Sequence, residues 1–424
     1  MIPGAGFRSR RLAAAAVAVI LTAGAAASPG SAAGAAPGPQ RIVAVGDVHG
    51  DLDGLVSILE EAGIADATGR WVGGGATLVQ LGDLLDRGTR LREVLDLLMR
   101  LEAEAPRAGG RVIVLLGNHE AMNLFGITRD VNRDAWAAFA GEHGEQRRAA
   151  ALAAFRELWV RRMTEVGRDP TFTDEAAAQW LAMHPPGFVE YSEAFGPSGR
   201  YGAWLRQRPL AVILGETLFV HGGYGPALEG TSVDEINRRA AAELASFDAT
   251  RSWMVSEGLA LPWSSAEELV GEAQRELDWI AAQEPGTVPP ERVARATRLA
   301  LNWGSGCLMG PDGPVWFRSL ATWDELEHGA QVDRLLDGLG VARQVVGHNP
   351  QPDGRIRSRF SGRVLLIDTG MLAAVYGGRP AALEIVGDTL TAIYPGERHA
   401  LAPQPRCSPA AATATPAAAF TPGM

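Results

Sequence analysis

RIVAVGDVHG, residues 41–50, sets a pattern that the chain repeats. In each copy a run of aliphatic residues leads into a glycine turn that carries aspartate, histidine or asparagine. The further copies are TLVQLGDLLDRG (77–88), RVIVLLGNHE (111–120), TLFVHGG (217–223) and RQVVGHN (343–349). Short aliphatic runs bounded by turn residues predict buried strands, and open α/β sheets place their chemistry at the carboxyl ends of such strands. These strand-end turns therefore predict one site assembled from several strand ends.

The spacing between the first three copies predicts an α/β fold. Apolar residues recur at helical intervals in residues 52–64 and 92–105. The chain thus opens with the order β-α-β-α-β, which is typical of a sheet with crossover helices. The later strands are predicted at residues 210–214, 217–220, 343–346, 363–367, 381–385 and 390–393.

Two helical stretches interrupt this pattern. We expect a helical cap inserted at about residues 128–208, with helices at 134–163 and 174–184. A second helical stretch is expected at about residues 232–303, including a helix from residue 291. Plausible capping boxes begin it at Ser232/Glu235 and Ser265/Glu268.

The two ends of the chain differ from the domain predicted at residues 37–400. Residues 1–36 carry Arg8, Arg10 and Arg11 ahead of an apolar run and small residues, the pattern of an export signal and linker. The Sec and twin-arginine routes both fit, so we expect a periplasmic or extracellular protein. The apolar run is too short for a stable membrane span. Residues 401–424 are rich in proline, alanine and threonine, and we expect a disordered low-complexity tail.

The composition excludes several classes of site. All 39 basic residues are arginine, so neither a Schiff-base lysine nor a Walker A lysine is available. The net charge of −10 argues against a nucleic-acid partner. Cys307 and Cys407 are the only cysteines and form no C-x-x-C pattern, which argues against zinc-ribbon and redox sites. No disulfide between them is expected, because Cys407 lies in the tail.

The strand-end turns supply the side chains that hold metal ions. Asp47 and His49 alternate by two residues, so on an extended segment both point the same way. Asp83 has two oxygens with which to bridge two metals. The full set of candidate ligands is Asp47, His49, Asp83, Asn118, His221 and His348. Mixed nitrogen and oxygen ligands suit Mn, Fe or Zn better than Mg or Ca. Two such divalent ions would lower the pKa of a bridging water and make it a nucleophile.

The other motif residues fit phosphoryl chemistry. His119 is the candidate general acid, with Asp86 orienting its imidazole. Arg87 and Arg318 are candidates to grip the phosphate oxygens, together with Asn118. Asp368 is either an acid partner of His348 or a turn-forming aspartate. The remaining histidines have no such context and are predicted at the surface: His143, His184, His328 and His399.

These motifs resemble those of the calcineurin-like metallophosphoesterases. The chain is similar to the phosphoprotein phosphatase branch through GDVHG, GDLLDRG and GNHE. Within that branch it resembles the Shewanella-like protein phosphatases, through GNHEAMNLFG (117–126), GPVWFR (313–318), IDTGM (367–371) and YGG (376–378). The resemblance implies a four-layer αββα β-sandwich with a helical cap insertion. It also implies the metal, acid and phosphate roles given above. Two departures are GHN in place of GHT and the absence of a SAPNY-type segment.

Three functions follow from the sequence. The leading one is a metal-dependent phosphomonoesterase that acts on phosphotyrosine or phosphoserine/threonine in proteins, or on related small phosphate esters. An alternative is a nucleotide or dinucleoside polyphosphate hydrolase, which would stack a base on aromatic residues; the candidates are Trp136, Trp159, Trp180 and Trp204. A third is a non-catalytic phosphate-binding scaffold, which would require a lost ligand, and none is missing.

Overall fold

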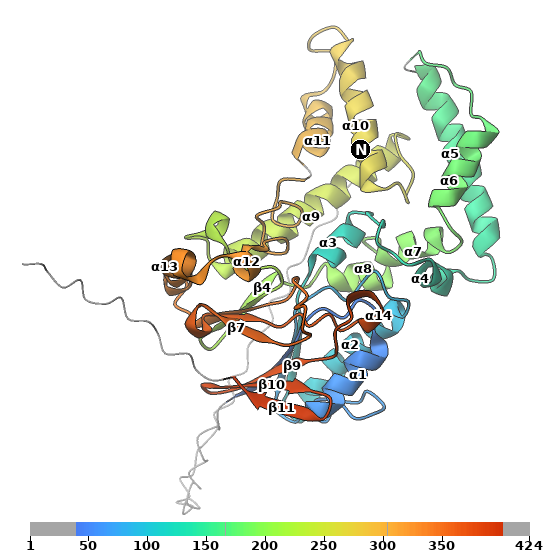
Figure 1. Ribbon diagram of the computed structural model, residues 1–424. Helices are drawn as coiled ribbons and strands as arrows, with labels where there is room; N and C mark the ends of the chain where they lie inside the picture. The colour runs from blue at the N-terminus through green and yellow to red at the C-terminus, as the bar shows by residue number, and fades with distance from the viewer. Residues whose placement is uncertain (1–39, 166, 303, 402–424) are drawn as a thin grey trace, which may run out of the picture. The chain divides into compact units, whose positions relative to one another are not determined.

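The computed structural model describes residues 40–165, 167–302 and 304–401 (Figure 1). The predicted export signal lies outside the described residues. So do Cys407 and all but the first residue of the predicted tail.

Six strands form the first sheet in the order β11-β10-β9-β1-β2-β3. The strands β1, β2 and β3 are parallel, and β9, β10 and β11 continue the sheet in antiparallel fashion. Their bounds are Arg41–Val45 (β1), Thr77–Gln80 (β2), Arg111–Val114 (β3), Ala382–Val386 (β9), Thr389–Tyr394 (β10) and Glu397–Ala400 (β11). Because the first three strands run parallel, the turns that follow them meet at one edge.

Five strands form the second sheet in the order β4-β5-β6-β8-β7. Here β5, β6 and β8 are parallel, while β4 and β7 pair antiparallel at the two edges. Their bounds are Ala211–Leu214 (β4), Thr217–Val220 (β5), Arg343–Val346 (β6), Arg357–Arg359 (β7) and Val364–Leu366 (β8). The predicted strands are confirmed. The short edge strands β7 and β11 were not predicted, because neither segment carries an aliphatic run.

Alternation along the strands divides the core into an inner and an outer part. Ile42 and Ala44 of β1 belong to an inner cluster with Phe219 and Leu365 of the second sheet. The intervening residues of the same strands belong to the outer cluster, which the helices cover. Because successive side chains point to opposite faces, each sheet packs on the other sheet and on helices. The order of layers is helix, sheet, sheet, helix, and the predicted αββα sandwich is confirmed.

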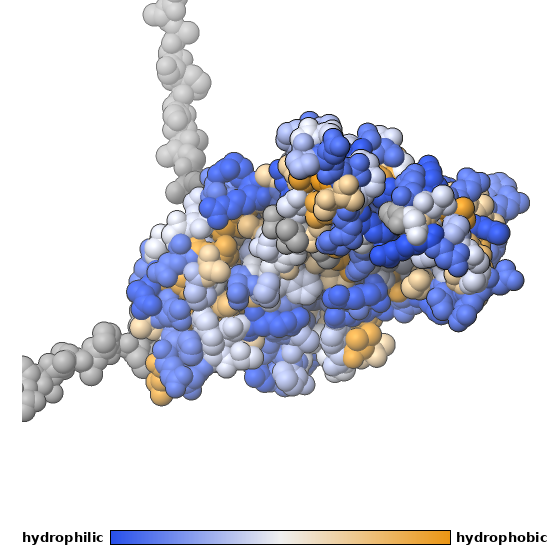
Figure 2. Space-filling view, turned by 90° about the horizontal axis from the view of Figure 1, so that it is seen from above, coloured by the Kyte–Doolittle hydropathy of each residue, from blue (hydrophilic) through white to orange (hydrophobic). Residues whose placement is uncertain are grey.

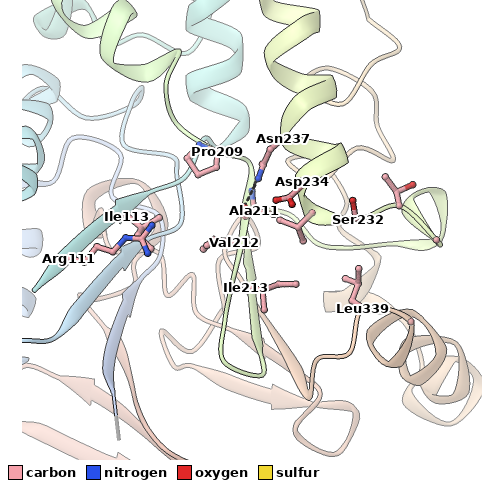
Figure 3. A pocket seen from close by; sticks show the side chains of 14 residues that line it. Arg111, Ile113, Pro209, Ala211, Val212, Ile213, Ser232, Asp234, Asn237 and Leu339 are labelled. Atoms are coloured by element: carbon pink, nitrogen blue, oxygen red, sulfur yellow. Dashed lines mark hydrogen bonds between the residues drawn. The ribbon is translucent and has the colours of Figure 1, made fainter. Parts of the chain in front are cut away.

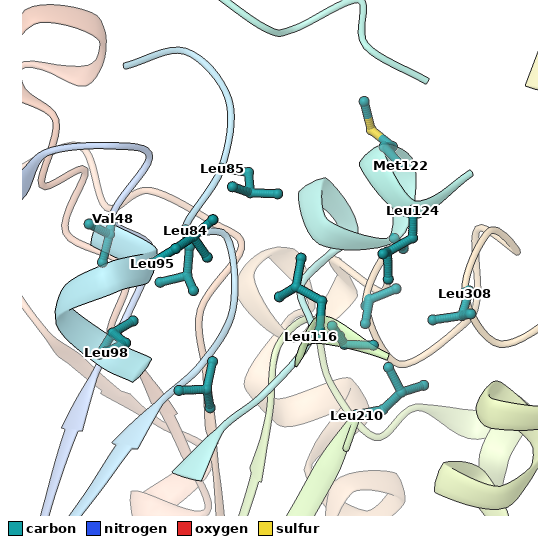
Figure 4. Packing of buried hydrophobic residues seen from close by; sticks show 14 of the residues in the cluster. Val48, Leu84, Leu85, Leu95, Leu98, Leu116, Met122, Leu124, Leu210 and Leu308 are labelled. Carbon is teal, nitrogen blue, oxygen red and sulfur yellow. The ribbon is translucent and has the colours of Figure 1, made fainter. Parts of the chain in front are cut away.

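Helices next to the first sheet support the turns that follow its strands. The helices α1 (Leu52–Glu61) and α2 (Leu91–Glu104) follow β1 and β2 as expected. A short helix, α3 (Asn118–Leu124), begins inside GNHE and was not predicted. Figure 4 shows part of the outer cluster, with Leu84 and Leu85 of a turn buried together with leucines of α2 and α3. These turns therefore rest on a close-packed apolar base.

The first helical insertion lies between β3 and β4. It holds α4 (Arg133–Phe139), α5 (Gly144–Glu165), α6 (Asp174–Met183), α7 (Phe188–Phe195) and α8 (Arg200–Leu205). The single helix predicted at residues 134–163 was wrong, because Ala140 leaves the helical conformation with ψ 119° and Gly141 follows it. The helices α7 and α8 were not predicted. Trp136, Trp180 and Trp204 are buried in this insertion.

The second helical stretch consists of α9 (Val233–Ser256), α10 (Ala266–Ala281) and α11 (Pro290–Asn302). The capping box at Ser265 is complete, because the Ser265 hydroxyl accepts from the backbone N–H of Glu268 and the Glu268 carboxylate accepts from that of Ser265. At Ser232 only the first of these two bonds forms, from the backbone N–H of Glu235 to the Ser232 hydroxyl. Later helices are α12 (Ser319–Thr322), α13 (Glu325–Gly338) and α14 (Ala373–Tyr376). Figure 2 shows a mainly hydrophilic face with small separate hydrophobic areas. None of the described helices combines the length and the apolar character needed to cross a membrane.

Candidate active site

The structure brings all six predicted metal ligands together at one edge of the sandwich. The turns after β1, β2 and β3 contribute Asp47, His49, Asp83 and Asn118, and those after β5 and β6 contribute His221 and His348. Each of the six is at most 4% exposed. Polar groups are buried at this level only when they have partners, so the contacts among them decide what the site does.

Strained backbone marks these turns. Of the seven non-glycine residues with positive φ in the described part of the chain, five belong to the site: His49, Asp83, Asp86, Arg87 and His348. Such conformations cost free energy and cluster where function requires them. Gly88 permits the turn after Arg87, because a Cβ on it would lie 2.0 Å from the carbonyl oxygen of His49.

The first group of ligands surrounds His221. Its Nδ1 donates to the carbonyl of Leu81, since a carbonyl only accepts, so Nε2 is the ring nitrogen that faces the other candidate ligands. That Nε2 lies 3.0 Å from Oδ1 of Asn118, 3.2 Å from Nδ1 of His348 and 3.3 Å from Oδ1 of Asp83.

His348 is arranged in the same way. Its Nε2 donates to the carbonyl of Trp316, which leaves a lone pair on Nδ1. Its backbone N–H donates to both carboxylate oxygens of Asp47, at 3.0 and 3.1 Å. Nitrogen and oxygen atoms of several strand-end turns thus converge, which is the arrangement that a cation satisfies.

A second group of ligands surrounds His49. Its Nδ1 donates to the carbonyl of Leu85 at 2.8 Å, and its Nε2 lies 3.7 Å from Oδ2 of Asp83. His49, Asp83 and His119 could hold one ion, and Asp83, His221 and His348 another. Asp83 is shared by the two groups, as expected for a bridging carboxylate.

Burial and neighbouring charges tune the titration of these groups. Burial above all lowers the pKa of His49 to about 3 and that of His348 to about 2, so both rings are neutral and able to bind metal. Burial, then Asp368 and Asp83, raise the pKa of Asp47. Burial opposes ionisation of Asp83, but His221 and His119 outweigh it and lower its pKa. Asp83 therefore lies beside the neutral ring of His49, where a bound cation would balance its charge.

His119 and Asp86 form a tight pair beside the ligands. Nδ1 of His119 lies 2.6 Å from Oδ2 of Asp86, and its Nε2 faces Oδ2 of Asp83 at 3.9 Å. Burial lowers the pKa of His119, but Asp83 and Asp86 raise it more, to about 8. We interpret His119 as a proton donor and not as a ligand, because a carboxylate at 2.6 Å favours the imidazolium, which has no lone pair for a metal.

Two arginines lie beside this cluster. Arg87 is half-buried with Nη1 3.4 Å from Nε2 of His49, and Arg318 is exposed with Nη1 bonded to the carbonyl of His348 at 2.9 Å. The guanidinium of Arg87 also lies 5.3 Å from the ring centre of Tyr376, whose ring is 5.6 Å from that of His49. Tyr376 was part of the YGG motif, but the sequence assigned it no role.

Two further residues of the site were missed. Glu120 accepts backbone N–H groups of Gly117, Asp83, Leu84 and Leu85 and thereby fixes the Asp83 turn. Gln80 links Gly46 and Gly82, each at the start of a ligand turn. A buried glutamine at the end of an aliphatic strand and a glutamate inside GNHE were the signals available.

The other polar predictions have mixed outcomes. The carboxylate of Asp368 accepts from its own turn at Gly370 and bonds to Asp47, so the turn interpretation holds and the acid partner of His348 is absent from the described contacts. His143 and His399 are exposed as predicted, and His328 is half-buried against Trp323. The prediction for His184 was wrong.

His184 is 8% exposed. Its ring stacks on Trp180 at 4.1 Å, and its Nδ1 donates to the carbonyl of Trp180. The stacking partner one helical turn earlier explains the burial.

A separate cavity of about 550 Å³ lies elsewhere in the fold. Figure 3 shows it between β3, β4 and the start of α9, lined by Arg111, Ile113, Ala211 and Asp234 among others. Arg111 is the first residue of β3, at the strand end opposite to the ligand turns. None of the residues that line this cavity is a predicted site residue. The candidate active site therefore lies at the strand-end turns and not in this cavity.

The model of the calcineurin-like phosphoesterase family matches residues 40–254, which include five of the six ligand positions. The chain belongs to the calcineurin-like phosphoesterase family. It is therefore a hydrolase of phosphate esters, and the buried ligand set agrees with the divalent metals that a metallophosphoesterase uses.

Relatives of this phosphoesterase include named phosphatases. It is 26% identical over 369 residues to Shewanella-like protein phosphatase 2 of Arabidopsis thaliana. The matched region covers 83% of this chain and 76% of that relative. An uncharacterized protein of Schizosaccharomyces pombe is 28% identical over 366 residues, or 85% and 82% of the two chains. A cold-active protein-tyrosine phosphatase of a psychrophilic Shewanella has a TM-score of 0.53 at 24% identity, with 86% of this chain and 81% of that chain covered. That likeness shows the fold alone.

Proposed function

We propose that this phosphoesterase is a phosphomonoesterase that removes phosphate from protein side chains with two divalent cations. The observation that carries the proposal is the convergence of His221 Nε2 and His348 Nδ1 with Asp83, beside the His119–Asp86 pair. Cation ligands and a proton donor thus share one carboxylate, Asp83.

The donor set fits two cations of the Mn, Fe or Zn type. One group offers imidazole, amide and carboxylate ligands from Asp83, Asn118, His221 and His348, and the other offers His49 and Asp83. Asp47 adds a further carboxylate beside His348. Imidazole nitrogen mixed with oxygen favours these metals over Mg and Ca. When bound, the cations would neutralise phosphate oxygens and make a water more acidic.

The remaining groups act on the phosphate and on the leaving alcohol. Arg87 and Arg318 have guanidinium donors beside the ligands, suited to holding non-bridging oxygens. Asn118 can donate from its amide nitrogen while its oxygen faces the metal ligands. His119 gives the proton on Nε2 to the leaving oxygen, and Asp86 stabilises the imidazolium before the transfer.

Phosphoproteins are the substrate class that the comparisons favour. The Arabidopsis relative is named a protein phosphatase and the Shewanella structure a protein-tyrosine phosphatase. The nucleotide alternative depended on tryptophans free to stack on a base, but Trp136, Trp180 and Trp204 are at most 8% exposed and lie in the core of the insertion. The fourth candidate, Trp159, is half-buried, and its ring packs against Phe155 and Phe172. The scaffold alternative required a lost ligand, and the full ligand set is present.

The test is a substrate comparison on metal-stripped protein reloaded with Mn²⁺. We expect hydrolysis of para-nitrophenyl phosphate and of phosphotyrosine or phosphoserine peptides, and much slower hydrolysis of diadenosine tetraphosphate. Peptide arms of matched sequence separate tyrosine from serine preference. Absence of monoester hydrolysis under every metal would overturn the proposal.

We also propose that the protein is exported, on the basis of Arg8, Arg10 and Arg11 before an apolar run. Fractionation of cells that express the full chain should recover activity outside the cytoplasm. Replacing Arg10 and Arg11 by lysine separates the routes, since only twin-arginine export requires the pair. Activity confined to the cytoplasm in the full chain would contradict export.

A further inference from the structure

Asp86 has a second partner besides the imidazole of His119. While Oδ2 contacts His119, Oδ1 accepts a hydrogen bond from Nδ2 of Asn123 at 3.0 Å. The same amide nitrogen donates to the backbone carbonyl of His119 at 2.9 Å. Both amide hydrogens of Asn123 are therefore used within the acid–base pair, and the side chain joins the two members of that pair.

Tyr191 fixes the orientation of this amide. Its hydroxyl donates to Oδ1 of Asn123 at 2.6 Å. Burial, together with Asp86 and Glu120, raises the pKa of Tyr191 well above 10, so the hydroxyl keeps its proton and acts as a donor. Without that donor the amide could rotate and turn its oxygen toward the carboxylate of Asp86, where two acceptors would repel.

The ring of Tyr191 is held by the first helical insertion. It belongs to α7 and packs against Trp136 at 4.5 Å, Phe139 at 4.8 Å and Phe195 at 4.4 Å between ring centres. Tyr191, Asn123, Asp86 and His119 are each at most 3% exposed. Because aromatic packing fixes the ring, the hydroxyl has one position from which to donate.

The first residues of the insertion contact the turn that contains Asp86 and Arg87. The backbone N–H of Arg87 donates to the carbonyl of Asp130, and Nδ2 of Asn132 donates to the carbonyl of Arg87 at 3.1 Å. Arg87 has φ 65° and Asp86 has φ 66°. The insertion thus contacts the strained Asp86–Arg87 turn through its side chains and through its backbone.

We propose that Asn123 and Tyr191 are positioning residues that orient Asp86 and, through it, the proton donor His119. The first helical insertion then serves the proton-transfer step through a buried tyrosine. The proposal rests on the proposed function, in which His119 protonates the leaving oxygen. Buried polar chains of this kind are effective only when every member is satisfied.

The role predicts a dependence on the leaving group. Protonation by His119 matters for an ester of a weakly acidic alcohol and matters little for an ester whose alcohol leaves as a stable anion. Tyr191→Phe should therefore lower kcat for phenyl phosphate by about tenfold and leave kcat for 2,4-dinitrophenyl phosphate within about twofold. KM and metal content should stay unchanged, because the variant touches neither ligands nor arginines.

The matched control is Tyr201→Phe. Tyr201 lies in the same aromatic cluster, 5.7 Å from Phe195, but its hydroxyl contacts Asp96 and not the acid–base pair. Both residues are buried tyrosines of the same insertion, and each variant removes one hydroxyl. A purely structural effect would lower the activity of both variants on both esters equally.

Asn123→Ala tests the chain from its other end, and thermal denaturation of each variant reports folding. We expect Asn123→Ala to show the same selective loss on phenyl phosphate. Equal losses on the two esters, or a Tyr191→Phe enzyme indistinguishable from Tyr201→Phe, would overturn the positioning role. Failure of the proposed function looks different, since the wild type would then hydrolyse neither ester, or His119→Asn would lose both equally.

Discussion

Nε2 of His221 lies 3.2 Å from Nδ1 of His348, and these are the two ring nitrogens available to a metal, because the opposite nitrogen of each ring donates to a backbone carbonyl. A cation held by both nitrogens would join the turns that follow β5 and β6 in the folded state. Metal binding should therefore stabilise the fold.

Metal removal should lower the melting temperature. A ligand that binds only the folded state stabilises it by about 2.7 kcal/mol at a hundredfold excess over its Kd. We expect chelation to lower Tm by several degrees and Mn²⁺ to restore it, as measured by differential scanning fluorimetry. His348→Ala should lose the metal-dependent rise, while His399→Ala, an exposed residue, should keep it. A wild-type Tm that changes neither with chelator nor with Mn²⁺ would refute the two-ion interpretation.

His119→Asn and Asp83→Asn should fail in different ways. Loss of a general acid costs about 10² to 10⁴ in turnover, so His119→Asn should be slow while its metal content stays normal. Asp83 contacts both ligand groups, so Asp83→Asn should lose metal as well as activity. Mass spectrometry of the metal in the purified variants separates the two. The exposed His143→Asn serves as the control, and metal loss in His119→Asn would instead make His119 a ligand.

Arg87→Ala should lower activity, because it removes a charged hydrogen-bond donor that stabilises the transition state. A hydrogen bond to a charged group contributes about 1.5–3 kcal/mol, which predicts a fall of roughly 10- to 100-fold in kcat/KM. Arg87→Lys should recover only part, because an ammonium lacks the planar pair of donors. Arg90→Ala removes a neighbouring arginine that pairs with Asp53, and it should keep full activity. Equal activity of Arg87→Ala and Arg90→Ala would remove Arg87 from the phosphate site.

Acid should destabilise the fold through His184. Burial lowers the pKa of His184 below 6.5, so as pH falls below about 6.5 the unfolded chain takes up the proton before the folded chain does. Stability from this group is therefore present above that pH and is lost as pH falls, with a slope of at most about 1.4 kcal/mol per pH unit. Urea unfolding at several pH values should show a shallower decline in His184→Gln than in wild type. The exposed His143→Gln is the control and should lose stability with falling pH as wild type does. An identical decline in wild type and His184→Gln would contradict this role of His184.

The sequence predicted the ligand turns because each is local. An aliphatic strand, a glycine and a metal-binding side chain lie within ten residues, as in RIVAVGDVHG. Because β1, β2 and β3 pair in parallel, the turns that follow them meet at one edge of the sheet, so no contact between distant side chains had to be predicted. The strands alone predicted an α/β sheet with crossover helices, and the αββα arrangement was implied by the resemblance to the calcineurin-like metallophosphoesterases.

What the sequence did not reveal depends on contacts between distant segments. Tyr191 bonds to Asn123 across 68 residues, and no local pattern marks either residue. The positive φ of Asp83 and Asp86 also lies outside what residue types alone predict. For His184 a local signal existed, since Trp180 precedes it by one helical turn, and the prediction overlooked it.

The candidate metal centre draws on both sheets. The hydrogen bond from the backbone of His348 to Asp47 spans 301 positions of the chain, from the second sheet to the first. Contacts this distant in sequence form late, after the entropy of closing a long loop has been lost. Bound ions would connect the two sheets, and a newly made chain could complete the metal site only after β6, which ends just before His348, has joined the second sheet.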